Sequence, residues 1–285
     1  MRIRLLLALL LFPLCISAQE RFSVKGRIVN EKGEAVEYVQ VGIPKRGIGT
    51  ISSVDGRFEI NVPADTLEFH HVSYEIGFHP VSGPQEDVLI VLKESELSPA
   101  VFIDGDAKEK YLVRAGTRIP GATGGFHYEG GIVKGEEFGS VANARKPFLV
   151  KDILFSVMAN DIPGCVLSIN IYRIEGEPEQ FTSVLHKPIY LNVAVSEEVQ
   201  DFDVQPEESI LLEPGRYYFS FDIVDCDMDV VNGYLEKAES ERGSFRMSLY
   251  TFLYFKSSYM RAAALGEFKR FPVNFGIAVK GLEYQ

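Results

Sequence analysis

The chain has 285 residues, of which 24% are charged, with a formal net charge of −11, three cysteines and no tryptophan. This length allows two domains of ordinary size. The acidity excludes nucleic acid and anionic lipid surfaces as the main partners, because both attract basic protein surfaces.

Residues 1–18 have the three parts of a secretory signal peptide. Arg2 and Arg4 give a positive start, an apolar run follows over residues 5–14, and small residues lead to a cleavage site after Ala18. The apolar run is shorter than the roughly 20 residues that span a bilayer as a helix. We therefore expect an export signal, whose removal takes the net charge from −11 to −13. Cys15 leaves a lipid-anchored form open, although Leu14 stands where lipoprotein signals place a small residue.

Residues 19–93 alternate short strand-like runs with turn signals, which is typical of a β-sandwich. The runs are FSVKGRIVN, EYVQVGIP, GTISSV, RFEINV, DTLEFHHVS and EDVLIVL. Asp55-Gly56 is a strong two-residue turn signal and predicts a hairpin in which Ser53 faces Phe58 across the ladder. In that strand Phe58, Ile60 and Val62 point to one face and the intervening polar residues to the other.

This region resembles the carboxypeptidase-regulatory-like domain. The matching positions are Gly26, Ile28, Gly33, Val36, Val39, Val41, Gly49, Thr50, Asp55, Gly56, Phe58, Leu67, Phe69, Val72 and Tyr74. Asn30, Ala35 and Ser52-Ser53 depart from the family pattern in turn-compatible ways. The resemblance implies a transthyretin-like sandwich of seven strands in an exported, envelope-associated protein. It implies no peptidase activity, because the module is an accessory of the enzymes that give it its name.

Residues 94–146 are rich in glycine and weakly periodic, which favours a connection leading into the first part of a second domain. Residues 147–285 return to longer strands with clear alternation, as in Leu167, Ile169 and Ile171. Seven such runs predict a second antiparallel sandwich of jelly-roll type. It is similar to the sandwich that follows the regulatory-like module in other exported bacterial proteins. The fold class is therefore all-β, with no transmembrane segment after signal cleavage.

Cys165 and Cys226 are the cysteines that remain after the signal peptide. An exported compartment permits a disulfide between them, but two cysteines do not define a disulfide framework. A pair of buried thiols remains the alternative.

No H-E-x-x-H, G-x-S-x-G or S-x-x-K motif appears in a suitable context, so the sequence predicts no catalytic residue and no cofactor. Asp225, Asp227 and Asp229 have a spacing that could bring three carboxylates to one Ca²⁺ in a loop. Val230 stands where an EF-hand requires glycine, and in a strand the three aspartates would simply share the solvent face.

Tyr250 and Tyr254 lie on one face of the run SLYTFLYF. If that face is open, the two rings could stack on sugars; if both faces are covered, the run is a core strand. The aromatic pair is the sequence-based candidate for a ligand site.

These features predict a non-catalytic, exported envelope protein that acts as an interaction module, of adhesion or receptor-accessory type, with an envelope protein as partner. The alternative is a carbohydrate-binding module that captures a glycan. A periplasmic hydrolase without a recognisable motif is the third hypothesis.

Overall fold

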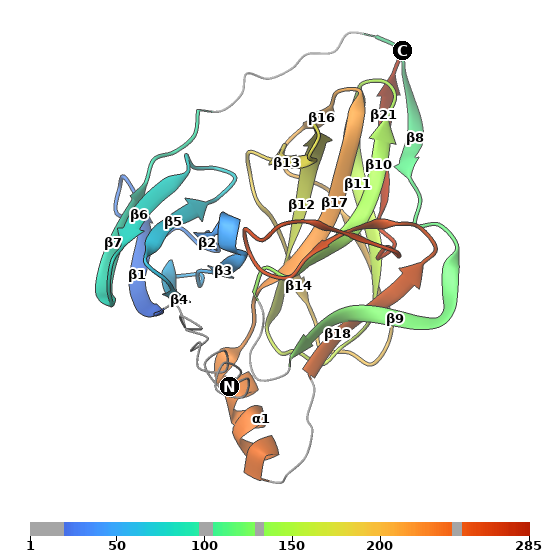
Figure 1. The fold of residues 1–285 in the computed structure, drawn as a ribbon. Helices are drawn as coiled ribbons and strands as arrows, with labels where there is room; N and C mark the ends of the chain where they lie inside the picture. Colours follow the sequence, from blue (N-terminus) through green and yellow to red (C-terminus); the bar gives the residue numbers. More distant parts are fainter. Residues whose placement is uncertain (1–19, 97–104, 129–133, 241–246) are drawn as a thin grey trace, which may run out of the picture.

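The computed structural model describes residues 20–96, 105–128, 134–240 and 247–285. It consists of two β-sandwiches that lie side by side, with one helix projecting from the larger (Figure 1). The all-β prediction with two successive sandwiches is confirmed. The expected signal peptide, its cleavage site after Ala18 and the lipidation candidate Cys15 lie outside the described residues.

The N-terminal sandwich has seven strands in two sheets. The first sheet has the order β4-β1-β7, in which β1 pairs antiparallel with β4 and parallel with β7. The second has the order β3-β2-β5-β6 and is antiparallel. The strand bounds are β1 Phe22–Asn30, β2 Gln40–Ile43, β3 Ile48–Ile51, β4 Arg57–Val62, β5 Asp65–His70, β6 Gly77–Val81 and β7 Gln85–Leu92.

Strand β4 shows why this sandwich forms. Phe58, Ile60 and Val62 are buried between the sheets, while Arg57, Glu59 and Asn61 are exposed, as the alternation predicts. The Phe58 ring packs edge-on against Phe69 of the opposite sheet, with ring centroids 5.4 Å apart.

The hairpin expected around Asp55-Gly56 is wrong in its pairing. The turn exists: the Gly56 N–H donates to the Ser53 carbonyl oxygen at 2.9 Å, and Gly56 has φ 77°. However, Ser53 lies opposite Arg57, and β3 and β4 belong to different sheets. The turn therefore carries the chain from one layer of the sandwich to the other.

The C-terminal sandwich also has two sheets. One has the order β13-β12-β17-β10-β19-β20, with β14 also paired to β12. The other has the order β8-β21-β11-β18-β9, with β15 and β16 also paired to β11. The bounds are β8 Ala107–Val113, β9 Arg118–Tyr128, β10 Glu137–Ala144, β11 Phe148–Asn160, β12 Cys165–Glu175, β13 Gln180–Ser183, β14 Ile189–Val193, β15 Gln200–Val204, β16 Ile210–Leu212, β17 Gly215–Asp225, β18 Met247–Tyr254, β19 Ser258–Arg261, β20 Lys269–Phe271 and β21 Ala278–Tyr284.

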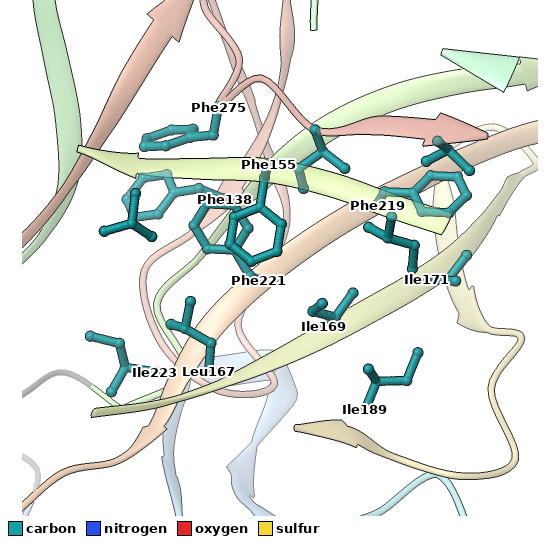
Figure 2. Close-up of a cluster of buried hydrophobic side chains, with 14 of the residues drawn as sticks. Phe138, Phe155, Leu167, Ile169, Ile171, Ile189, Phe219, Phe221, Ile223 and Phe275 are labelled. Atoms are coloured by element: carbon teal, nitrogen blue, oxygen red, sulfur yellow. The ribbon is translucent and has the colours of Figure 1, made fainter. Parts of the chain in front are cut away.

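The core of this sandwich is built from one face of each long strand. Phe138, Phe155 and Phe221 meet between the sheets, and the rings of Phe155 and Phe221 stack with centroids 5.2 Å apart (Figure 2). Leu167 and Ile169 extend this core along β12 (Figure 2). Because side chains alternate along a strand, the polar residues between these positions face away from the core.

Much of the segment expected as a glycine-rich connection is strand. β8, β9 and β10 all fall within residues 94–146, and they pair with β21, β18 and β17. Gly124 and Gly125 of β9 lie directly against β18: an added Cβ would meet a methyl carbon of Leu253 at 2.9 Å and the Leu249 carbonyl oxygen at 1.8 Å. The glycines there permit close packing of strands and do not mark a loop.

The α-helix α1, Met228–Ser240, was not expected. It follows β17 and projects from the sandwich (Figure 1). Within the described part of the chain, no helix is long and apolar enough to cross a membrane.

The two sandwiches are joined by a small apolar contact and by hydrogen bonds. Ile51 packs with Val224 and Ala264, which are all buried. Gly49 of β3 touches the Ala264 backbone so closely that an added Cβ would lie 1.8 Å from the Ala264 carbonyl oxygen. The Ser73 hydroxyl donates to the carbonyl oxygen of His186 at 2.8 Å across the same junction.

Candidate functional site

The outer face of the sheet containing β12, β17, β10 and β19 carries a row of polar residues. Ser168, Asp222, Glu137 and Arg261 lie opposite one another in register across these four strands. An outer sheet face normally meets water, but all four residues are at least nine-tenths buried. The N-terminal sandwich and the loop between β19 and β20 cover this face, so the row becomes the floor of a cavity.

Glu137 and Arg261 form a buried ion pair in this row, with Arg261 Nη2 2.6 Å from Glu137 Oε2. The Ser220 hydroxyl donates to the other carboxylate oxygen of Glu137. Arg261 also donates to Gln40 Oε1 of the N-terminal sandwich at 3.1 Å. Its guanidinium carbon lies 4.9 Å from the centre of the Phe268 ring. The pair is therefore held in place by partners from both sandwiches, while Arg261 Nε is buried without a hydrogen-bond partner among the described residues.

Asp222 is fully buried beside this pair. The Asn170 amide donates to Asp222 Oδ1 at 2.9 Å, whereas Oδ2 has no partner in the part of the chain that the structure describes. Burial, followed by the nearby charge of Glu137, raises the pKa of Asp222 to about 8, against the opposing effects of Arg261 and Asn170. The carboxyl group therefore carries a proton at neutral pH.

The N-terminal sandwich supplies the opposite wall through the segment after β5. The His71 ring accepts a hydrogen bond at Nδ1 from the Ser73 N–H at 3.2 Å, which leaves the proton of the neutral ring on Nε2. Nε2 is buried and has no described partner. Burial lowers the pKa of His71 to about 4, so the ring is neutral at physiological pH.

Tyr38 belongs to the same wall and has an unusual backbone conformation, with φ 51°. A positive φ at a bulky residue is strained and persists only where the surroundings fix it. Here the Tyr38 hydroxyl donates to Asp225 at 3.2 Å, and its ring packs edge-on against Tyr190 at 4.9 Å. Both partners belong to the C-terminal sandwich, so the strain is maintained by the junction.

Aromatic rings complete the site. Phe181 and Phe268 lie with centroids 4.3 Å apart, and Phe268 packs edge-on against Tyr172 at 5.4 Å. Phe181 comes from β13, Phe268 from the loop after β19 and Tyr172 from β12. This cluster gives the polar floor an apolar side.

These walls line a cavity of about 460 Å³ between the two sandwiches, and the cavity is partly open to solvent. Its lining includes Tyr38, His71, Asn170, Phe181, Asp222 and Arg261. The volume lies within the range of roughly 300–1,000 Å³ that small-molecule sites occupy, and such sites combine apolar walls with a few polar groups. An unpaired buried polar atom costs about 1–3 kcal/mol, and three such atoms belong to residues that line this one cavity. The arrangement is suited to binding a small polar ligand.

Tyr250 and Tyr254, the sequence-based ligand candidates, lie elsewhere. Both are half-buried on β18 and neither lines the cavity. The Tyr250 ring packs edge-on against His127 at 5.2 Å, and the Tyr254 ring covers the backbone of Gly276. The two tyrosines therefore pack mainly against their own sandwich.

The three aspartates of the calcium hypothesis each have a different structural role. Asp225 ends β17 and binds Tyr38 and Lys134, while Asp229 lies in the first turn of α1. Asp227 accepts a hydrogen bond from the Val230 N–H at 3.2 Å and caps the helix. Neither the loop site nor the shared strand face is formed. Among the described residues, no group of three or more metal-ligating side chains could hold a metal ion.

Cys165 and Cys226 are both free and buried in this structure, as in the alternative of two buried thiols. Burial raises the pKa of Cys165 to about 12 and that of Cys226 to about 11. The thiolate is the reactive form of cysteine, so both thiols are unreactive at neutral pH.

Sequence reasoning missed the polar floor of the cavity, although a signal was present. Ser168 and Asn170 alternate with core residues on β12, as Ser220 and Asp222 do on β17. This pattern was consistent with a solvent-facing side, and the covering sandwich is visible only in three dimensions.

No family model and no curated protein matches the chain. Among solved structures, it is similar to a DUF3823 family protein from Parabacteroides merdae, with 11% identity, a TM-score of 0.21 and coverage of 90% of this chain and 98% of that one. A DUF3823 family protein from Bacteroides ovatus matches with 11% identity, a TM-score of 0.21 and coverage of 71% and 97%. The VP2 subviral particle of infectious bursal disease virus matches with 12% identity, a TM-score of 0.25 and coverage of 81% and 54%. With TM-scores this low, we infer neither fold nor function from these neighbours.

Proposed function

We propose that the protein is an exported, non-catalytic binding protein of the bacterial envelope and that the cavity between its sandwiches is the ligand site. The observation that carries this proposal is the set of unpaired buried atoms on Asp222, Arg261 and His71, which all line one cavity. The signal-like N-terminus and the resemblance to the regulatory-like module support export.

Among ligand classes, the aromatic side of the cavity favours the carbohydrate alternative over an adhesion partner. An adhesive protein partner requires a broad exposed surface, with standard interfaces burying about 1,600 Å² in total. The unpaired groups of Asp222, Arg261 and His71 instead lie in one cavity between two modules. Capture of a small polar ligand, such as a sugar of a glycan, fits this geometry.

The test is a glycan-array screen with the purified chain, followed by titration calorimetry on every hit. Phe181→Ala removes a half-buried ring of the cavity, and Tyr250→Ala is the matched control on β18. We expect Phe181→Ala to weaken binding at least ten-fold and Tyr250→Ala to leave it unchanged. The reverse result would move the site to β18. If no glycan on the array binds, an envelope protein becomes the favoured partner. Cross-linking in intact cells would then be used to find it.

A hydrolase is the second candidate, favoured by one observation. Asp222, with its raised pKa, is protonated at neutral pH, as a general acid must be. Glycoside hydrolysis usually needs a second available carboxylate. Both oxygens of Glu137 are engaged by Ser220, Arg261 and Tyr172, so we rank binding above hydrolysis. Release of reducing sugar that Asp222→Asn abolishes would reverse this order.

A further inference from the structure

Resting on the proposed function, we propose that the cavity binds an uncharged sugar residue through hydroxyl groups that bridge the two sandwiches. The hydroxyls bond Asp222 and Arg261 on one wall and His71 on the other. The proposal follows from the hydrogen-bonding roles of these groups, from their charges and from the rings beside them.

The hydrogen-bonding roles require a ligand that presents several acceptors. Arg261 Nε is a donor, and His71 Nε2 is a donor because the Nδ1 atom of the ring already accepts from Ser73. Asp222 is protonated at neutral pH and its Oδ1 accepts from Asn170, so Oδ2 carries the proton and is a third donor. Hydroxyl oxygens accept hydrogen bonds through their lone pairs. A sugar presents several hydroxyls around one ring, which suits partners on opposite walls.

The charges in the cavity disfavour ionic ligands. Arg261 is neutralised by Glu137 at 2.6 Å. A cationic ligand would meet the Arg261 guanidinium, which already lies over the Phe268 ring. An anionic ligand would meet the Glu137 carboxylate, which lies opposite Arg261 in the same row. A neutral ligand leaves the ion pair intact and avoids the cost of burying another charge.

The rings of Phe181, Phe268 and Tyr172 supply the apolar part of the recognition. A pyranose ring has C–H groups on its faces and hydroxyls around its rim. Its faces can therefore pack on the aromatic side while its rim reaches the polar floor.

The test is titration calorimetry of the purified full chain with glucose, galactose, mannose and their disaccharides. Glucuronic acid, galacturonic acid, glucosamine and mannosamine serve as charged counterparts. We expect at least one neutral sugar to bind, and its charged counterparts to bind at least ten-fold more weakly.

His71→Asn retains an acceptor near the Ser73 N–H and removes the donor at Nε2. We expect this substitution to weaken sugar binding about ten-fold. His79→Asn, on β6 outside the cavity lining, is the control and should have no effect.

Asp222→Leu provides a second variant, because leucine has a similar branched shape and no polar atom, and we expect it to weaken binding by at least as much. If a charged sugar binds more tightly than its neutral counterpart and depends on His71, this inference is overturned while the proposed function stands. If no sugar in the panel binds, the inference also falls, and the Phe181→Ala comparison decides separately whether the cavity is a ligand site. If sugars bind but neither His71→Asn nor Asp222→Leu weakens them, the inference falls, and the Phe181→Ala comparison again decides whether the cavity is the site.

Discussion

Burial pushes two titratable residues of the cavity toward their neutral forms. It lowers the pKa of His71 to about 4 and raises the pKa of Asp222 to about 8. A low-polarity environment disfavours whichever form is charged, so it moves a base and an acid in opposite directions. At neutral pH both residues are therefore uncharged, and each should leave its own signature in the pH dependence of stability.

For His71 the native pKa lies below the ordinary value of 6.5. The unfolded chain therefore binds more protons than the native state between about pH 6.5 and 4, and stability falls as the pH falls through that window. We expect a loss of up to about 3 kcal/mol from this residue. Urea unfolding at pH 7 and pH 4.5 measures it, and His71→Asn should show a smaller difference between the two pH values. An equal difference in both proteins would contradict the assignment.

For Asp222 the native pKa lies above the ordinary value of 3.8. The native state then holds a proton that the unfolded chain has lost, so stability declines as the pH rises from about 4 to 8. The decline has a limiting slope of roughly 1.4 kcal/mol per pH unit. The Asp222→Asn variant has no ionisable group at this position. The free energy of unfolding of this variant, relative to that of the unsubstituted chain, should therefore increase across this window. A constant difference over the whole range would show that Asp222 is ionised in the native state.

At the level of single residues, the sequence was informative where the pattern is local. The buried positions of β4 follow from alternation alone, because Phe58, Ile60 and Val62 recur with the period of a strand. The site was not predictable in the same way. Arg261 and Glu137 are far apart in the chain and meet only because β10 pairs with β19.

Among the secondary-structure elements, β3 shows how tightly the two sandwiches fit together. Gly49 touches the Ala264 backbone, and an added Cβ would lie 1.8 Å from the carbonyl oxygen. Backbone cannot move aside as a flexible side chain can, so one of the two segments must shift.

We therefore expect Gly49→Ala to destabilise the protein by about 1–3 kcal/mol, as overpacking does, and to expose the loop after β19. Hydrogen exchange of residues 262–268 together with thermal unfolding measures both effects. Gly83→Ala is the matched control, because Gly83 has no atom within 4 Å of its Cβ position. Equal effects of the two substitutions would contradict the close contact.

Helix α1 depends on Asp227 at its start. The carboxylate accepts the Val230 N–H, one of the amides that the first turn of a helix leaves unpaired. Asp227→Ala should cost about 1 kcal/mol and accelerate hydrogen exchange at residues 228–231. Added Ca²⁺ should not change the unfolding temperature of either protein. A Ca²⁺-dependent rise that Asp227→Ala abolishes would restore the calcium hypothesis.

The elements that the sequence mispredicted share one physical cause. The Asp55-Gly56 turn was correctly located, but β4 pairs with β1, where Phe58 faces Gly26 and its ring occupies the space that a Cβ would fill. Likewise, the glycines of β9 serve a close approach to β18 from elsewhere in the chain. Local turn and loop signals contain no information about a partner that is distant in sequence.

In the whole molecule, the cavity exists only because two sandwiches meet. One wall is a sheet face of the C-terminal sandwich, and the other is the segment after β5 of the N-terminal sandwich. Their direct apolar contact is small, centred on Ile51, Val224 and Ala264. A ligand that bonds both walls would add to this contact, so binding should stabilise the junction as well as fill the site.

The sheet order of the C-terminal sandwich also has a consequence for how the protein is made. β21, residues Ala278–Tyr284, is inserted between β8 and β11, although these two strands are synthesised well before it. A growing chain on the ribosome therefore has a gap in the middle of this sheet until residue 284 has emerged. The sandwich can close only after that point, and the unfinished sheet presents two unpaired strand edges in the meantime.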